Sequence, residues 1–191
     1  MDKKELNPAI DGKKMLDLIR KRQSDRRYLD QPVEPEKLDR ILEAGRLSPS
    51  ACNAQPWKFI VVDDRNLIQK LADAASAKIL GMNSFVAQAP VNIVIVREKA
   101  NLSSRIGSTI KNKDYSLIDT GIAAENICLQ ATAEGLGSCM IGWFDETMVR
   151  KILGIPAVKR VELIITIGYP SGETRTKKRK PPEEVISRNR Y

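Results

Sequence analysis

The spacing of apolar residues predicts one α/β domain in which helices and strands alternate. The chain has 191 residues, of which 42% are hydrophobic, so it is long and apolar enough for one buried core. Apolar residues recur at helical spacing in five segments, and four short β-branched runs have the character of strands. Because these two kinds of segment alternate, the pattern alone favours a parallel sheet covered by helices.

The first half of the chain contains three predicted helices and two predicted strands. Residues 1–12 precede them and are expected to form a flexible arm. Pro35 suits the first turn of the second helix, and either Asp63 or Asp64 can cap the third, which would end at Gly81. In chain order, the predicted segments are a helix over residues 15–22, a helix over 35–45, a strand over 58–62, a helix from 63 or 64 to 81 and a strand over 91–96.

The second half begins with a long segment and then returns to alternation. Residues 97–114 have no apolar periodicity and are rich in Ser, Asn, Lys and Arg, which predicts a loop. Residues 119–134 are small or apolar on almost every side, which is typical of a helix that is buried on most of its faces. The remaining predicted segments are a strand over 138–141, a helix that Asp145 caps and Leu153 ends, a strand over 161–167 and a basic arm over 171–191.

The composition excludes several classes of catalytic site. The chain contains no histidine, which rules out catalysis by Ser–His or Cys–His pairs and argues against a zinc site. Its three cysteines, Cys52, Cys128 and Cys139, lack the spacing of metal ligands, so no metal site is predicted. No apolar run approaches the roughly 20 residues that span a bilayer, and the N-terminus leads into no signal sequence. A cytoplasmic protein with no membrane-bound part is therefore expected.

A basic stretch follows the first predicted helix. Five of the eight residues from Arg20 to Arg27 are cations, in a chain whose net charge is +8. These cations repel one another unless an anion lies among them, so a bound phosphate group is one interpretation. The other interpretation is a helix end whose positive charges complement the helix dipole and need no ligand.

The segment from Ser48 to Trp57 separates a predicted helix from a strand and is rich in small polar residues. Pro49 and Pro56 prevent a continuous helix through it. None of its residues is charged, and its hydroxyls, amides and backbone N–H groups could contact a ligand with several donors and acceptors. An ordinary helix-to-strand connection has a similar composition and is the alternative interpretation.

Three short motifs stand in order along the chain. Residues 22–26 read R-Q-S-D-R, residues 48–57 read S-P-S-A-C-N-A-Q-P-W, and residues 177–181 read K-K-R-K-P. They resemble R-R/H-S-x-R/K, S-P-S-A-x-N-x-Q-P-W and K-x-R-x-P, which are signatures of the nitroreductase family of FMN-dependent flavoproteins. Together they cover the chain from about Arg20 to Pro181, and they are specific for the family but not for its substrate.

The resemblance implies an α+β fold in place of the parallel arrangement. The family has three layers, in which helices flank a mixed, mostly antiparallel sheet, and this is the fold class that we expect. Residues 13–170 would form a single FMN-binding domain, with residues 97–114 as a variable cover over the flavin. The resemblance also implies a homodimer with FMN sites at the subunit interface. The helix over 119–134 would lie in the dimer core, and the arm over 171–191 would wrap the partner.

The matched motifs imply which residues would contact FMN. The N-terminal motif would contact the phosphate, the ribityl chain and the pyrimidine side of the ring through Arg22, Gln23, Ser24 and Arg26. The loop would reach the flavin bound mainly by the other subunit through Pro49, Ser50, Ala51 and Asn53, and Gln55 lies in the same motif. The C-terminal motif would clamp the phosphate through Lys177 and Arg179, with Lys178 and Lys180 one register away as alternatives.

A further segment of the resemblance concerns the flavin ring. Ile141 and Gly142 match a segment that lines the ring near N5, where the backbone N–H of Gly142 is a candidate donor. The pair Gly142-Trp143 departs from the commoner forms of this segment, so the N–H that would be used stays open. Trp143 either fills the core or the dimer interface, or it faces the substrate. No catalytic side chain is implied, because the flavin carries the chemistry, and Cys52 is assigned no catalytic part.

The implied activity is an NAD(P)H-dependent oxidoreductase reaction of the ping-pong type. NADH or NADPH would deliver a hydride to N5 of FMN and leave, and a nitroaromatic, quinone or enone acceptor would then occupy the same face. One alternative keeps the fold but uses specialised flavin chemistry such as reductive dehalogenation. Another is a non-enzymatic protein that binds flavin or nucleic acid, although an aromatic content of 5% argues against nucleic acid.

Overall fold

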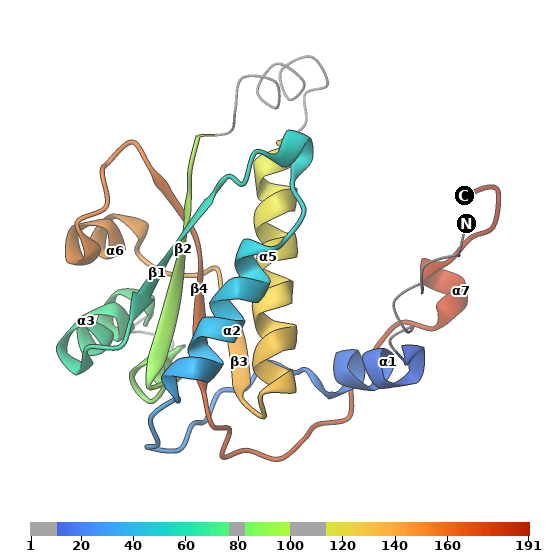
Figure 1. The fold of residues 1–191 in the computed structure, drawn as a ribbon, viewed down its shortest axis with the longest axis horizontal. Coiled ribbons are helices and arrows are strands. Elements are labelled where there is room, and N and C mark those ends of the chain that lie inside the picture. The colour runs from blue at the N-terminus through green and yellow to red at the C-terminus, as the bar shows by residue number, and fades with distance from the viewer. Residues whose placement is uncertain (1–10, 77–82, 100–113) are drawn as a thin grey trace, which may run out of the picture.

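The computed structural model describes residues 11–76, 83–99 and 114–191. These residues form a four-stranded sheet and the helices around it (Figure 1). The sheet has the order β1-β2-β4-β3, and all three pairings are antiparallel. A single parallel bridge, between Ser24 and Ser138, adds to it. The strands are β1 (Trp57–Val62), β2 (Val91–Arg97), β3 (Gly137–Ile141) and β4 (Arg160–Gly168). The α+β prediction is therefore confirmed.

The parallel sheet that the alternation pattern alone favours is wrong, and the connection between β1 and β2 gives the reason. The chain leaves β1 at Val62 and enters β2 beside it, because Val62 pairs with Asn92. The intervening helix α3 (Arg65–Ala75) and the 3-10 turn η2 (Ser84–Ala87) therefore return the chain to the same end of the sheet. A parallel neighbour would require a crossover to the opposite end.

Helices cover both faces of the sheet, so the molecule has three layers (Figure 1). On one face lie α3, η2 and α6 (Glu146–Leu153), and on the other lie α2 (Pro35–Arg46) and α5 (Tyr115–Ala133). The central strand β2 contributes to both cores. Val94 and Val96 pack on the α3 side, whereas Ile93 and Ile95 pack on the α5 side. This two-sided burial explains why the strand is continuously apolar.

Aspartate side chains cap the N-termini of four of the helices. Asp11, Asp64, Asp114 and Asp145 each accept a hydrogen bond from a backbone N–H in the first turn of α1 (Gly12–Lys21), α3, α5 and α6, respectively. The predicted caps Asp64 and Asp145 and the first-turn Pro35 are confirmed. Because Asp114 caps α5, this helix begins at Tyr115, four residues before the predicted start.

The predicted end of the third helix is wrong. Helix α3 ends at Ala75, and Ser76 already has an extended backbone, so the helix does not continue to Gly81. The remainder of that prediction, including Ile79 and Gly81, lies outside the described residues.

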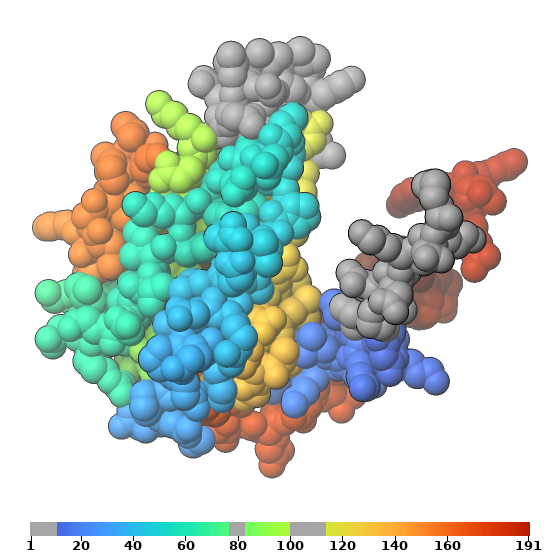
Figure 2. Space-filling view, viewed as in Figure 1, coloured from blue at the N-terminus to red at the C-terminus, as the bar shows by residue number. Residues whose placement is uncertain are grey.

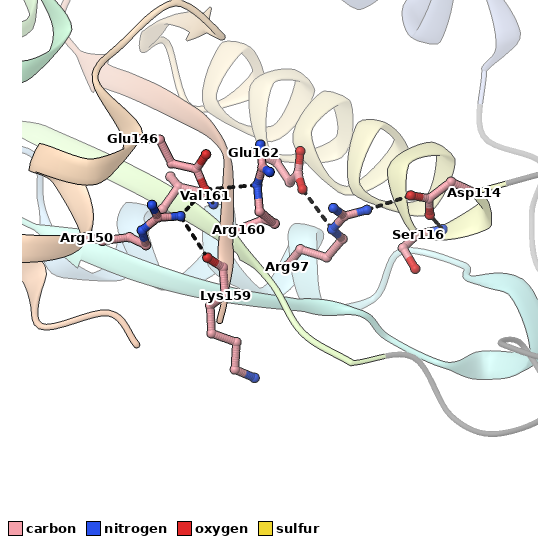
Figure 3. Close-up of polar contacts among 9 residues, drawn as sticks. All are labelled: Arg97, Asp114, Ser116, Glu146, Arg150, Lys159, Arg160, Val161 and Glu162. Carbon is pink, nitrogen blue, oxygen red and sulfur yellow. Dashed lines mark hydrogen bonds and ion pairs between the residues drawn. The ribbon is translucent and has the colours of Figure 1, made fainter. Parts of the chain in front are cut away.

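An ion-pair network joins the end of β2 to α5 and β4 (Figure 3). The Arg97 guanidinium contacts Asp114 at 2.6 Å and Glu162 at 2.8 Å. In the same view, Glu146 of α6 accepts from Arg150, Arg160 and the backbone N–H of Val161. Arg97 was predicted to begin the loop over 97–114, but it pairs with Trp57 of β1 and Arg160 of β4 and is the last residue of β2. Residues 100–113 of that loop lie outside the described part, so its role as a cover stays a prediction.

Two helices leave apolar side chains in solvent within a single chain. Helix α1 lies with α7 (Pro182–Val185) to one side of the three layers, as Figures 1 and 2 show, and none of its residues is buried. On α5, which was expected to be buried on most sides, one strip remains uncovered. The exposed apolar residues of the two helices are Met15, Leu16 and Ile19 of α1 and Leu117, Ile118 and Ile122 of α5. In the described part of the chain, no helix is both long and apolar enough to cross a membrane.

Candidate functional site

A basic pocket lies where the segment after α1 meets the C-terminal arm. The pocket has a volume of about 300 Å³, and six of its nine lining residues are lysine or arginine, with no acidic residue among them. Its walls are Arg22, Gln23, Ser24, Arg26, Arg175, Thr176, Lys177, Lys178 and Arg179. The fold therefore brings together two of the three predicted motifs, although about 150 residues separate them. Such a concentration of cations and hydroxyls is suited to a phosphate group.

Hydrogen bonds tie the C-terminal arm to the N-terminal motif within one chain. The backbone N–H of Arg175 donates to Gln23 Oε1 at 3.0 Å, and its guanidinium donates to the carbonyl of Ser24. The Lys177 ammonium donates to the carbonyl of Ile19 at the end of α1. On its other side, the Gln23 amide donates to Asp25 Oδ1 at 2.8 Å. The Gln23 side chain therefore hydrogen-bonds both to the C-terminal arm, at Arg175, and to its own segment, at Asp25, and so holds the arm against the N-terminal motif.

Two acidic residues beside the pocket were missed by the sequence analysis. Arg22 donates to both carboxylate oxygens of Glu125 on α5, at 3.3 and 2.9 Å, which fixes the guanidinium at the pocket wall. Asp25 lies behind the pocket against Gly137, and burial raises the pKa of its carboxyl group. The only sequence signal for Glu125 is that it is one of two acids on a helix that is mostly small and apolar.

The loop from Ser48 to Trp57 contains a single 3-10 turn, η1 (Ala51–Asn53), as the two prolines predict. Three of its residues, Cys52, Asn53 and Gln55, have positive φ angles of 52°, 50° and 45°. Side chains with a Cβ adopt this conformation at a cost, and such strain concentrates at functional sites. Within the loop, the Gln55 N–H donates to Ser50 Oγ at 2.9 Å, and the Gln55 amide donates to Asn53 Oδ1 at 3.1 Å.

Helix α5 holds this loop from the side. Both carboxylate oxygens of Asp119 accept from the backbone N–H of Ala51, at 3.1 and 3.2 Å. About two helical turns further along α5, the Asn126 amide donates to Ser48 Oγ at 2.8 Å. The sequence analysis assigned neither residue a role, because the partners lie about 70 residues away in the chain.

The ring-lining segment that the resemblance implies stands apart from the basic pocket. Ile141 is buried in the core beneath α6, whereas Gly142 is exposed. Trp143 is 67% exposed, so within one chain it does not fill the core. Neither this segment nor the loop from Pro49 to Gln55 lines the pocket. A single chain therefore assembles the phosphate-type part of the predicted site, but not the loop and ring-lining parts.

The donor set of the pocket fits the phosphate end of FMN. Guanidinium and ammonium groups bind a phosphate dianion, and the amide of Gln23 and the hydroxyl of Ser24 supply neutral partners for a polar chain. Fold and pocket together thus define a protein that binds a phosphorylated cofactor on an antiparallel α+β scaffold. The sequence model of the nitroreductase family matches residues 19–82 and 79–169, and the chain belongs to this family.

Individual relatives agree with the family match. A protein of Archaeoglobus fulgidus, provisionally named an NADH dehydrogenase/NAD(P)H nitroreductase, is 35% identical over 83% of this chain and 86% of its own. The FMN reductase [NAD(P)H] of Bacillus subtilis is 27% identical over 88% of this chain and 70% of its own. The solved structure of an FMN-dependent nitroreductase from Clostridium difficile is 32% identical, with a TM-score of 0.76 over 93% of this chain and all of that one. The chain is therefore an NAD(P)H-dependent oxidoreductase with FMN as its cofactor.

The pocket predicts that FMN binding weakens at alkaline pH. Partial burial, followed by the neighbouring charges of Arg22 and Arg179, lowers the pKa of Lys177. Lys177 therefore loses its proton at a lower pH than an ordinary lysine, and if it binds the phosphate as the C-terminal motif predicts, one attraction for that group is lost with the proton. We expect FMN affinity to fall about tenfold as pH rises through this titration, measured by flavin fluorescence.

The variant Lys177→Arg is the matched control for this pH dependence, because arginine stays charged throughout the range. The FMN affinity of this variant should stay constant over the pH range in which the affinity of the wild type falls. An equal fall in both proteins would show that another group causes the pH dependence.

Proposed function

We propose that this protein catalyses two successive hydride transfers, from NADH or NADPH to FMN and then to a small nitroaromatic, quinone or enone acceptor. FMN, when bound, supplies the redox chemistry by accepting a hydride and passing electrons on. The observation that supports the proposal is the basic pocket. In it, the N-terminal motif and the C-terminal motif of this nitroreductase-family chain come together. A chain without histidine is compatible with this chemistry, because the protein's tasks are binding and orientation.

Each part of the proposed site has a distinct task. Arg22, Arg26, Lys177 and Arg179 would hold the phosphate, while Gln23 and Ser24 would contact the polar chain and the ring. The loop would contribute Pro49, Ser50, Ala51, Asn53 and Gln55. Ile141 and Gly142 would line the ring near N5. Gly142 suits a close approach, because a Cβ added there would meet only Leu163, at 4.0 Å.

We also propose that the active species is a homodimer in which each FMN site takes residues from both subunits. Two observations support this. The loop and the basic pocket do not meet within one chain, and α1 and α5 expose apolar side chains that a partner could cover. The basic arm over 171–191, which belongs to the same domain as residues 13–170, would then also contact the partner. The predicted arm over residues 1–12 does not include its last two residues, because Asp11 caps α1 and Gly12 begins it.

The proposed reaction is tested with the purified protein and its bound flavin. A visible spectrum of FMN at about one per subunit is expected, together with NADH or NADPH consumption that requires a quinone or nitroaromatic. A ping-pong reaction gives parallel lines when initial rates are plotted reciprocally at several acceptor concentrations. Intersecting lines would contradict the two successive transfers, and turnover only with halogenated aromatics would favour dehalogenation.

The proposed dimer predicts that a charge on the exposed strip of α5 separates the subunits. Ile122 is 37% exposed in one chain, and Ile122→Glu would place a carboxylate in the proposed interface. We expect the variant to sediment as a monomer and to lose most of its FMN. The control Val158→Glu changes a residue that is 83% exposed and belongs to the segment between α6 and β4, not to α1 or α5, so it should remain dimeric. A dimeric Ile122→Glu protein would contradict this interface.

A further inference from the structure

Asp119 of α5 is a buried residue, and its carboxylate contacts the backbone of the loop from Ser48 to Trp57. Only 4% of its surface is exposed, although burial of a carboxylate is costly and raises its pKa. Both of its oxygens lie within hydrogen-bonding distance of one group, the backbone N–H of Ala51. The negative charge of Asp114 also repels that of Asp119 and raises its pKa further. An alanine at this position of α5 would avoid both the cost of burial and the repulsion. The hydrogen bond between the carboxylate and the loop is therefore what offsets these costs.

The loop needs such an anchor because its backbone is strained. Cys52, Asn53 and Gln55 have left-handed φ angles within four residues, and conformations of this kind persist only where the surroundings hold them. The Ala51 N–H stands immediately before this strained stretch. On the other side of Pro49, Ser48 is buried and receives the Asn126 amide while its own hydroxyl donates to the Ala44 carbonyl. Both flanks of Pro49 are thus tied to α5.

The two anchors share one face of α5. Asp119 and Asn126 are seven residues apart, which is two helical turns, so their side chains project in nearly the same direction. One rigid helix therefore sets the position of two points of the loop. The same helix carries Glu125, which orients Arg22 in the basic pocket.

We propose that Asp119, assisted by Asn126, is the positioning residue that holds the loop from Ser48 to Gln55 in its FMN-binding shape. The proposal rests on the proposed role of this loop in FMN binding. Neither residue contacts the flavin in this assignment. Asp119 acts by accepting the Ala51 N–H, so that Ser50, Ala51 and Asn53 present their donors and acceptors in a prearranged form.

The variants Asp119→Ala and Asp119→Asn separate positioning from a merely structural role. Asparagine retains a side-chain oxygen that accepts the Ala51 N–H, whereas alanine does not. We expect Asp119→Ala to raise the Kd for FMN about ten- to a hundredfold, and Asp119→Asn to recover most of this loss. Asn126→Ala should have a smaller effect in the same direction. Ile127→Val, a change at a buried neighbour on the same helix, is the control and should leave FMN affinity unchanged.

Hydrogen exchange of the apoprotein supplies a readout that does not depend on FMN. The amides of residues 51–55 should exchange faster in Asp119→Ala than in the wild type or in Asp119→Asn, while those of β2 keep their protection. Wild-type FMN affinity in Asp119→Ala, or an Asp119→Asn protein as weak as Asp119→Ala, would overturn the assignment of Asp119. A wild-type protein that binds no FMN would instead overturn the proposed function, and unchanged loop exchange in Asp119→Ala would overturn the anchor itself.

Discussion

Replacing Arg22 by alanine is expected to weaken FMN binding about ten- to a hundredfold while the fold remains intact. In the proposed site, the change would remove a charge-assisted hydrogen bond to the phosphate, and such bonds contribute about 1.5–3 kcal/mol. It also frees Glu125, whose carboxylate would then add a negative charge beside the pocket. Because the Glu125 side chain is 38% exposed, water can solvate it, so the unfolding temperature of the apoprotein should change little.

The control for Arg22 is another arginine that pairs with the same helix. Arg40 of α2 donates to both oxygens of Glu134, the residue that caps the C-terminus of α5, at 2.7 and 2.8 Å, but it does not line the basic pocket. Arg40→Ala therefore removes a similar ion pair and the same net charge. It should keep wild-type FMN affinity, as measured by fluorescence titration. If Arg22→Ala and Arg40→Ala bind FMN equally well, Arg22 has no part in holding the phosphate.

Replacing Gly168 by alanine is expected to destabilise the fold strongly. This glycine ends β4, where an added Cβ would lie 2.6 Å from Pro90 Cδ and 3.0 Å from Tyr28 Cδ1. Neither neighbour can move easily. The Pro90 ring is rigid, and the buried Tyr28 hydroxyl is hydrogen-bonded to Thr166 at 2.6 Å and to the Asp25 carbonyl at 2.8 Å. Overpacking of this kind costs about 1–3 kcal/mol.

Thermal unfolding of the apoprotein measures this cost. For a chain of this length, each kcal/mol lowers the Tm by about 2–4 °C. Gly172→Ala is the matched control, because it lies four residues further on and a Cβ there would meet no atom within 4 Å. Equal Tm values for the two variants would mean that Pro90 and Tyr28 yield to the added methyl group.

Much of the fold could be predicted because its signals are local. The strands β1 to β4 were predicted within two residues of their ends, since β-branched runs and their flanking turns lie within a few positions. Caps such as Asp145 are equally local, because the side chain bonds to an N–H three residues away. The end of α3 and the start of α5 were missed, because Ser76 already has an extended backbone and because Asp114, which caps α5, was assigned to the preceding loop.

The candidate site divides in the same way. Three motifs indicated the family and therefore FMN, because the residue types that bind phosphate and flavin recur at fixed local spacing. Glu125, Asp119 and Asn126 carry no such signal, since each is one polar residue on a mostly apolar helix. Their partners are Arg22, Ala51 and Ser48, and only the packing of α5 beside these segments makes the contacts.

The sequence by itself therefore determined most of the elements, the family and the residue types proposed to bind phosphate, all of which follow from short-range spacing and side-chain chemistry. Only the tertiary structure decided the order of the strands in the sheet, the meeting of residues 22–26 with 175–179, and the anchoring of the loop to α5. The physical reason is that hydrogen bonds and ion pairs act over about 3 Å in space. Chain separations of 70 to 150 residues do not reveal which groups will come within that distance until the helices have packed on the sheet.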